Sequence, residues 1–504
     1  MRTSQPATAA APPTFSWLVP SLSDLLFLAL VLWLLLFTLG GSPNGLLQDA
    51  AAGFHVRTGD WILSQGAVPH QDPFSFSKPN APWYAWEWLA DVFFSAIHSA
   101  LGLKGIILFA CFTLAGTIWI SLRHMTAAGG HALATLFVMH ALIGAGSVHF
   151  LARPHVFTLF FLAGAFWLID HDRDQPSRWI WALVPLTAVW ANLHGGFAGL
   201  ILTLWILAAG HILERDLARA QRYGLVGLAC LGAAAVNPYG LQLLAHMQQY
   251  LRAGWIREMV EEFQAPKLET PAGMYFEALL FAGIAVATRL AFQKRFAPAL
   301  LIVAWGHAAL LSVRHVPIFA LLVAPFLARE LTLLMRDAEA AFGRKSTWRI
   351  LNQIGDEHAR HLSRASFLIP TLIALFLVSD LGLNWPQDFP AAKFPIAAIA
   401  RHEQTLRTQR VFTLDAWGDY LIYRHYPGQK VFFDGRTDYY GEAMSRDYKA
   451  LLDGHPGWQE LLNKYKVDAV FLPDASPLIG HLKANPAWRL TGVVEDVAMI
   501  QRLR

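Results

Sequence analysis

Residues 41–89, the first polar stretch of an otherwise apolar chain, gather ionisable side chains that could do chemistry. Among them are Asp49, His55, Arg57, Asp60, Asp72 and Glu87. A carboxylate at a membrane surface can act as a general base or bind a divalent cation. A loop this long is uncommon unless it is functional or disordered, and its many Trp, Phe and Pro residues argue against disorder. We therefore interpret the stretch as an ordered active-site loop lying on the membrane.

Asp49 is the strongest candidate for a catalytic residue. It follows a short turn after the first apolar run and precedes a helical stretch around His55. The structural alternative is that Asp49 caps this helix. Glu87 lies in an aromatic, amphipathic stretch leading to Asp91, which makes it a candidate second carboxylate of the site. Asp72 precedes a proline and is typical of a turn residue.

The composition describes a membrane protein. Of the 504 residues, 55% are hydrophobic and 15% are charged. Lys and Arg (40) slightly outnumber Asp and Glu (36), but they cluster in short loops beside apolar segments. Membrane topology explains this pattern, so no nucleic-acid partner is expected. Cys111 and Cys230 both lie inside apolar segments, which predicts neither a disulfide framework nor a cysteine metal or redox site.

Membrane spans can be placed with the rule that about 20 apolar residues cross roughly 30 Å of hydrocarbon. The first run lacks a small-residue cleavage site and is too long for a signal-peptide core, so it is expected to be a retained anchor. The eleven predicted spans are residues 22–40, 104–122, 131–150, 155–170, 179–193, 196–212, 222–237, 273–290, 297–312, 316–335 and 366–384.

The basic residues predict the orientation of these spans. Basic clusters fall in every second connection, which places the N-terminus in the cytoplasm by the positive-inside rule. Residues 1–21 are then a loose cytoplasmic N-terminus, and 22–384 form the transmembrane domain with an extracytoplasmic first loop, 41–103. Residues 385–504 form an extracytoplasmic domain. The expected location is the inner (cytoplasmic) membrane, with many passes.

The C-terminal 120 residues have a soluble α/β pattern. Residues 410–415, 430–436 and 467–472 are predicted strands, with helices between them and a closing hairpin at 488–502. Asp434, Arg436 and Asp438 form a charged turn, for which a salt-bridged structural loop is the alternative interpretation. The predicted fold class is therefore a polytopic α-helical membrane protein with a small C-terminal α/β domain.

Polar residues recur at the extracytoplasmic ends of the predicted spans. Ionisable groups at membrane depth cost about 2.5–3.5 kcal/mol each, so their recurrence on one face predicts a shared polar cavity. Each has a structural alternative as a helix cap, helix stop or interfacial residue. The aromatic residues 83–88 are either an interfacial belt or a platform for sugars. Besides Asp49 and His55, the cavity candidates are Arg153, His155, Asn192, His194, Asn237, Arg314 and His315.

Several sequence strings together resemble a known family. From Asp49 the first loop reads D-x-x-x-G-F-H-V-R-T-G-D-W-I-L, followed by G-A-V-P-x-x-D-P-F-S-F and E-W-L. Later strings are ARPHVFT, WANLHGG, NPYG, RHVPIF and WGDYLIYRHYP…VFFDGRTDYYG. Together they cover nearly the whole chain. They resemble the GT-C superfamily of membrane glycosyltransferases, and within it a bacterial branch.

The resemblance implies the site's chemistry residue by residue. Asp49 takes the position of the family's first-loop acid, but residue 51 is Ala where a second acid often stands. This departure weakens the expectation of metal dependence; if a divalent cation such as Mg²⁺ or Mn²⁺ takes part, Asp49 is its expected ligand. The WWD-type motif of oligosaccharyltransferases is absent, the nearest string being Asp415-Ala416-Trp417-Gly418-Asp419. Transfer to an asparagine sequon is therefore not expected.

The implied reaction moves a sugar or oligosaccharide from a polyprenyl-phosphate carrier to an extracytoplasmic acceptor, which is a glycan, lipid or protein. Asp49 would deprotonate or orient the acceptor, with His55 assisting. Arg153, Arg314 and His315 would bind the lipid phosphate, because the guanidinium fork matches phosphate oxygens. Membrane lipids are the remaining expected partners. The other residues assigned to substrate binding are Arg57, Glu87, His155, Asn192, His194 and Asn237.

Two other function classes fit a polytopic chain. A transporter or flippase of lipid-linked intermediates places polar groups near the bilayer midplane, often in paired halves. Here they gather at the outer span ends, and no repeated halves are visible. A non-catalytic partner or scaffold of a glycan assembly complex is the third interpretation, with the C-terminal domain as its binding module.

Overall fold

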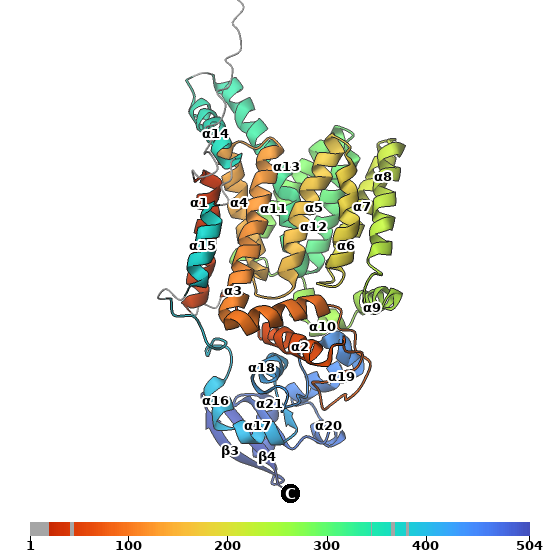
Figure 1. Ribbon diagram of the computed structural model, residues 1–504, viewed down its shortest axis with the longest axis vertical. Coiled ribbons are helices and arrows are strands. Elements are labelled where there is room, and N and C mark those ends of the chain that lie inside the picture. The colour runs from red at the N-terminus through yellow and green to blue at the C-terminus, as the bar shows by residue number, and fades with distance from the viewer. Residues whose placement is uncertain (1–19, 41–44, 344, 364–367, 380–382, 504) are drawn as a thin grey trace, which may run out of the picture.

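The computed structural model describes residues 20–40, 45–343, 345–363, 368–379 and 383–503. The predicted loose N-terminus therefore falls almost entirely outside the described residues, as does the start of the first loop at residues 41–44. An upright helical bundle stands on a layer of crosswise helices, and a small domain lies below that layer (Figure 1).

The bundle contains a helix at the position of each predicted span. Five segments are long and apolar enough to cross a membrane: Leu22–Leu39, Trp88–Ala127, Ala132–His149, Pro271–Phe292 and Val313–Phe342. Two shorter apolar helices are α7 (Phe197–Leu213) and α12 (Phe296–Leu311). The chain is thus a membrane protein, but the count of eleven spans is not confirmed. The remaining helices of the bundle are α5 (His155–Asp174), α6 (Leu183–Trp190), α8 (Leu217–Ala233) and α15 (Leu368–Val378).

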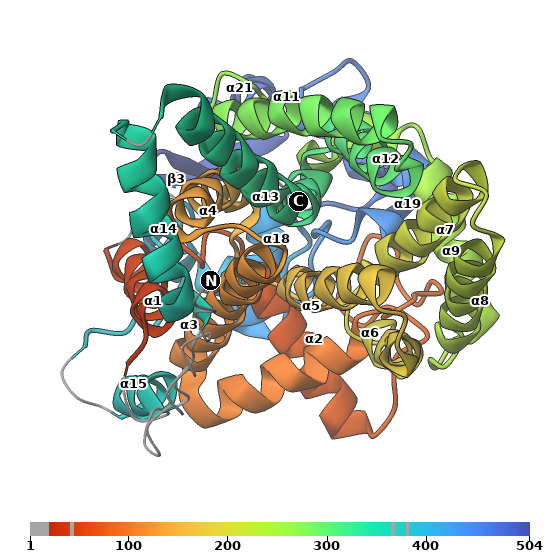
Figure 2. The same cartoon turned by 90° about the horizontal axis from the view of Figure 1, so that it is seen from above.

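The sequence also specifies where these helices begin. The Ser21 hydroxyl accepts from the Asp24 amide at 3.2 Å and the Asp24 carboxylate accepts from the Ser21 amide at 2.8 Å, a capping box at the start of α1 (Leu22–Leu39). Thr270 caps α11 (Pro271–Phe292), whose first residue is a proline. Seen from above, α11, α12, α7 and α8 follow one another around one side, and α1 and α15 lie together on the other (Figure 2).

A crosswise layer separates the bundle from the small domain. It consists of α2 (Ala51–Gln65) and the first part of α3 (Trp88–Ala127), which lie across the lower end of the bundle (Figure 1). Gly102 has φ +61°, a conformation that bends α3 from this layer into the bundle. Gly59 lets α2 pack on α3, since a Cβ there would lie 2.1 Å from the Asp91 carbonyl oxygen. The helix predicted after Asp49 is confirmed.

The C-terminal domain is built on a four-stranded sheet of order β1-β2-β4-β3. The first pair is parallel and the others are antiparallel, and the predicted closing hairpin is confirmed. Its helices are α16 (Ile396–Arg401), α17 (Glu403–Thr408), α18 (Asp415–His425), α19 (Thr437–Leu452), α20 (Trp458–Lys464) and α21 (Pro477–Lys483). Its strands are β1 (Val411–Phe412), β2 (Ala469–Pro473), β3 (Trp488–Val494) and β4 (Val497–Arg502).

The predicted strand at residues 430–436 is wrong. Val431 instead exchanges backbone hydrogen bonds with the first loop: its amide donates to the Phe74 carbonyl at 2.9 Å and its carbonyl accepts from the Phe76 amide at 3.0 Å. This stretch of high β-propensity therefore pairs with the first loop, more than 350 positions earlier, and not with the domain's own sheet. The Ser77 hydroxyl donates to the Phe432 carbonyl beside it.

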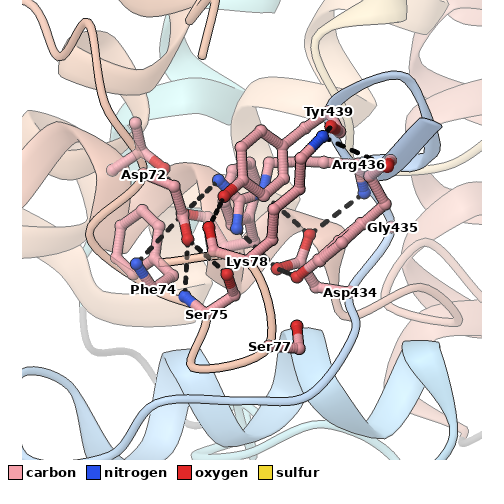
Figure 3. A network of polar contacts seen from close by, with 12 residues as sticks. Asp72, Phe74, Ser75, Ser77, Lys78, Asp434, Gly435, Arg436 and Tyr439 are labelled. Carbon is pink, nitrogen blue, oxygen red and sulfur yellow. Dashed lines mark hydrogen bonds and ion pairs between the residues drawn. The ribbon is translucent and has the colours of Figure 1, made fainter. Parts of the chain in front are cut away.

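Arg436 fastens the C-terminal domain to the first loop (Figure 3). It is buried and forms ion pairs with Asp434 at 2.6 Å and with Asp72 at 2.7 Å. Its guanidinium carbon lies 4.6 Å from the Trp83 ring centre and 5.1 Å from that of Phe54. Burial alone would raise the pKa of Asp72, but Arg436 and nearby hydrogen bonds lower it below its ordinary value. The salt-bridged structural interpretation of this turn is confirmed.

Replacing Arg436 by methionine should destabilise the protein by about 3–5 kcal/mol, because two buried carboxylates lose their counter-charge. The matched control is Arg446→Met, whose side chain is half exposed and paired with Glu442, so its loss should change stability far less. Thermal unfolding in detergent measures both variants. Equal midpoints for the two variants would contradict a fastening role for Arg436.

Candidate functional site

The first part of the site is a chain of alternating charges at the lower end of the bundle. Arg153 Nη1 lies 2.8 Å from Asp49 Oδ2 and 2.7 Å from Glu262 Oε1. The second Glu262 oxygen is 3.2 Å from Arg314 Nε. Burial would raise the pKa of Glu262, but Arg153 and Arg314 hold it well below its ordinary value. We call these four residues the arginine chain.

Backbone contacts bring the arginine chain together. The Ala152 amide donates to the Leu46 carbonyl at 2.9 Å, which sets Arg153 beside the segment that carries Asp49. The Ala51 amide, at the first residue of α2, donates to the other Asp49 oxygen at 2.8 Å. The N-cap itself is Ala50 and not Asp49, so Asp49 binds the helix end from one residue before the cap.

The other half of the arginine chain comes from two short 3₁₀ helices, η4 (Glu261–Phe263) and η5 (Val313–His315). The Val313 amide donates to the Gln264 carbonyl at 2.9 Å, and the Ser312 hydroxyl donates to the Glu262 carbonyl at 2.9 Å. Two connections distant in sequence therefore hold Glu262 and Arg314 side by side.

The second part of the site is a group of carboxylates and imidazoles. His55 Nδ1 lies 2.6 Å from Asp91 Oδ1, and its Nε2 lies 3.6 Å from Glu87 Oε2. The other Glu87 oxygen is 3.5 Å from His194 Nε2. We call these four residues the histidine pair group. Leu89 and Trp88 bind Asn192 through backbone and indole N–H groups, which sets Glu87 opposite His194.

Hydrogen bonds assign the proton positions in both imidazoles. Burial lowers the pKa of His55 to about 4, so its ring is neutral at neutral pH. With Asp91 ionised, the His55 Nδ1–H donates to it, which leaves the Nε2 lone pair toward Glu87. His194 Nδ1 accepts from the Gly196 amide at 3.1 Å, so its proton lies on Nε2, also toward Glu87. Glu87 therefore lies between one imidazole acceptor and one imidazole donor.

The arginine chain and the histidine pair group lie close enough for their charges to interact. Burial raises the pKa of Glu87, and the charges of Arg153 and Arg314 partly counteract this rise. The side chains of Asp49, Glu87, Arg153, His194, Glu262 and Arg314 are 17–28% exposed, so a substrate can reach them. Within the described residues, no hydrogen bond engages Arg153 Nη2 or either terminal nitrogen of Arg314. These N–H donors are available to an anionic ligand.

Other predicted site residues have structural partners. The His155 ring contacts the His149 carbonyl at 2.7 Å, and the His315 ring contacts the Ala308 carbonyl at 3.0 Å. Asn237 bonds within its own turn, to Ala234 and Gly240, and Asn192 holds three segments together. Arg57 lies two residues from His55, so it faces away from it, and it pairs with Asp60 and the Tyr423 carbonyl.

Three site residues were not singled out from the sequence. Glu262 was not predicted as a site residue, and Asp91 was named only as the end of the Glu87 stretch. Asp419, on α18, is buried, and its charge and that of Asp49 act on one another. Burial and the neighbouring Asp434 raise the pKa of Asp419 well above its ordinary value. A carboxylate inside an aromatic stretch was the signal that could have drawn attention to Asp91 and Asp419, whereas Glu262 lies in no such stretch.

The donor set does not form a metal site in the described part of the chain. No three Asp, Glu, His or Cys residues there converge with metal-ligand geometry. Asp49, the expected ligand, already has one oxygen on Arg153 and the other on the Ala51 amide. We therefore derive no chemical step through a metal.

An apolar groove of about 620 Å³ lies next to the site. It is lined by α7, α8 and α9 (Leu241–Arg252). Met247 on its wall contacts the position of Gly195, which follows His194. The groove therefore lies near His194, and its wall follows α7 from Phe197 to Trp205.

The comparisons with known proteins concern the fold. No family model and no curated protein matches the sequence. The apo oligosaccharyltransferase of Archaeoglobus fulgidus matches with a TM-score of 0.51 and 12% identity, over 90% of this chain and 70% of that one. The same enzyme tethered to an acceptor peptide with an NVT sequon matches with a TM-score of 0.50 and 12% identity, over 89% and 68%.

The chain shares the overall fold of this oligosaccharyltransferase. The match extends over nearly the whole chain, so it includes both the bundle and the C-terminal domain. The resemblance read from the sequence strings is therefore confirmed at the level of the fold. Within this fold, the arginine chain and the histidine pair group lie where the first loop, the bundle end and the C-terminal domain meet.

The buried neutral His55 predicts a pH dependence of stability. As the pH falls from 6.5 toward 4, the unfolded chain binds a proton at this position and the folded chain does not. Stability is therefore lost on acidification, by up to about 3 kcal/mol at pH 4 from this group. His55→Gln should flatten the loss between pH 6.5 and 4 in thermal unfolding, and the exposed His455→Gln should leave it unchanged. Parallel curves for His55→Gln and wild type would disprove the assignment.

Proposed function

We propose that this GT-C protein transfers a sugar or oligosaccharide from a polyprenyl-phosphate donor to an acceptor on the extracytoplasmic side of the inner membrane. The observation that carries the proposal is the set of unengaged N–H donors on Arg153 and Arg314, in a site whose His194 lies near an apolar groove. Guanidinium groups bind phosphate oxygens through paired hydrogen bonds, and an apolar groove suits an isoprenoid chain. A lipid phosphate offers both chemistries in one molecule.

In the proposed reaction, the bond between the sugar's anomeric carbon and the phosphate oxygen breaks. The acceptor oxygen forms the new bond to that carbon, and its proton passes to Asp49. Negative charge builds up on the departing phosphate, and Arg153 and Arg314 stabilise it there. A single displacement of this kind needs one base, unlike the two-carboxylate glycoside hydrolases.

The histidine pair group would orient the reacting molecules. His55 offers a lone pair and His194 offers an N–H to the same small volume beside Glu87, so an acceptor hydroxyl can bind between them. Because Glu262 holds Arg153 and Arg314 at the same time, it would fix the spacing of the two phosphate-binding groups.

Asp49→Asn should lower transfer by about 10²–10⁴-fold, since it removes the proposed base while keeping its shape. Wild type and variant would be purified from the native host, and bound lipid-linked sugar and glycosylated product compared by mass spectrometry. Loss of product with lipid-linked sugar retained is expected. The control is Asp474→Asn, paired with Lys483 in the C-terminal domain. Unchanged product in folded Asp49→Asn would instead favour a scaffold or a transporter.

Filling the groove should weaken binding of long-chain donors. Ala245→Trp places a large side chain against its wall and should raise the KM for a full-length polyprenyl donor by about tenfold, since each excluded CH₂ costs about 0.8 kcal/mol. The effect should be much smaller with a donor of two isoprene units. Phe281→Trp, on the exposed face of α11, is the control. Equal effects on both donors would show that the chain lies elsewhere.

A further inference from the structure

A strip of partly exposed aromatic rings runs from the arginine chain to the C-terminal domain. Its members are Tyr84 and Trp86 of the first loop, His246 and Tyr250 of α9, and Phe263 of η4. We call these five residues the aromatic strip.

The rings of the aromatic strip contact one another in series. Tyr84 stacks on His246 with centroids 4.5 Å apart, and Trp86 meets His246 at 5.6 Å. Trp86 also meets Tyr250 at 5.8 Å, and Tyr250 meets Phe263 at 5.5 Å. These edge-to-face and stacked contacts hold the rings in fixed orientations.

Each end of the aromatic strip reaches a charged group. At one end, the Arg314 guanidinium carbon lies 4.5 Å from the Phe263 ring centre. At the other end, His246 Nε2 lies 3.1 Å from Asp438 of α19. The aromatic strip therefore begins at the proposed phosphate-binding residues and ends against the C-terminal domain.

The aromatic strip does not face lipid. Leu241 and Leu251 of α9 are 72% and 61% exposed and lie on the exposed face of the helix. Leu251 also lines the apolar groove. His246 and Tyr250 lie on the opposite side of the helix, one turn apart, against the first loop. An interfacial belt would instead place these rings on the exposed apolar face.

Three polar groups on the aromatic strip form no hydrogen bond within the described structure. In the described structure no hydrogen bond engages the hydroxyls of Tyr84 and Tyr250 or the indole N–H of Trp86, and none of these atoms is buried. By contrast, Trp83 is buried against Arg436 and the Trp88 indole binds Asn192. Partly exposed rings with free hydrogen-bonding tips suit sugars, which present C–H faces and hydroxyl edges to a protein.

We propose that the aromatic strip binds successive sugar rings of an oligosaccharide substrate. This inference rests on the proposed transferase function and narrows its substrate to saccharides longer than one sugar. A saccharide attached to a phosphate at Arg314 would extend along the aromatic strip toward Asp438. The same chemistry would serve an oligosaccharide acceptor, and the two sources are separated by the choice of probe.

The test is a binding measurement on the full-length purified protein by saturation-transfer NMR. One probe is the oligosaccharide pool released by mild acid from the host's lipid-linked fraction, and the other is oligosaccharide cut from its mature glycans. Wild type should bind one of them, the first identifying the donor saccharide and the second the acceptor. Trp86→Leu and Tyr250→Leu should each weaken binding about tenfold, the scale of one aromatic contact.

Matched variants separate ring stacking from folding. Trp86→Phe keeps a ring and should weaken binding less than Trp86→Leu. Trp179→Leu removes a 64%-exposed indole elsewhere in the chain and should change nothing. If Trp86→Leu loses its thermal transition, Tyr250→Leu decides the question. Leucine variants that bind like wild type, or a wild type that binds neither probe, would overturn the inference.

Oligosaccharide binding and sugar transfer are measured separately, so that each proposal can fail on its own. A wild type that binds oligosaccharide but transfers nothing would count against the proposed reaction and leave the aromatic strip supported. A wild type that transfers sugar while the leucine variants bind unchanged would count against the aromatic strip alone.

Discussion

The buried ion pair between Arg436 and Asp72 is the interaction on which the rest of the site depends. It fixes a turn of the first loop against the C-terminal domain, and Val431 extends that contact through backbone hydrogen bonds. A buried arginine is stable only with its counter-charges in place, so the loop has one favourable position. Because the loop also supplies Asp49, His55 and Glu87, the position of the C-terminal domain determines the geometry of the site.

The polar residues at the bundle end serve two different purposes. Asn192, Asn237 and His155 satisfy backbone groups at helix ends, where the last carbonyls and first amides lack partners. Arg153 and Arg314 retain unengaged donors, and Glu87 lies between two imidazoles at distances too long for strong hydrogen bonds. Unused hydrogen-bonding capacity, rather than charge alone, distinguishes the residues that could bind a substrate.

Much of the fold followed from local pattern. Apolar runs predicted the bundle helices, and the alternation near the C-terminus predicted the hairpin of β3 and β4. The strand predicted at 430–436 was wrong because its partner is the first loop, and no local signal reveals a pairing across 350 positions. For the candidate site, Asp49 and Arg153 were expected together, whereas Glu262 was missed, because its role depends on a contact between two distant connections.

The contact between Asp72 and Arg436 also has a consequence for biogenesis. The two residues are 364 positions apart, so at 5–20 residues per second the ribosome needs roughly 20–70 s to make the second after the first. During that interval the first loop is complete but lacks its counterpart, and its aromatic side chains are exposed at the membrane surface. The site therefore assembles at the end of synthesis. A chain that stops before Arg436 carries every bundle helix but has an incomplete site.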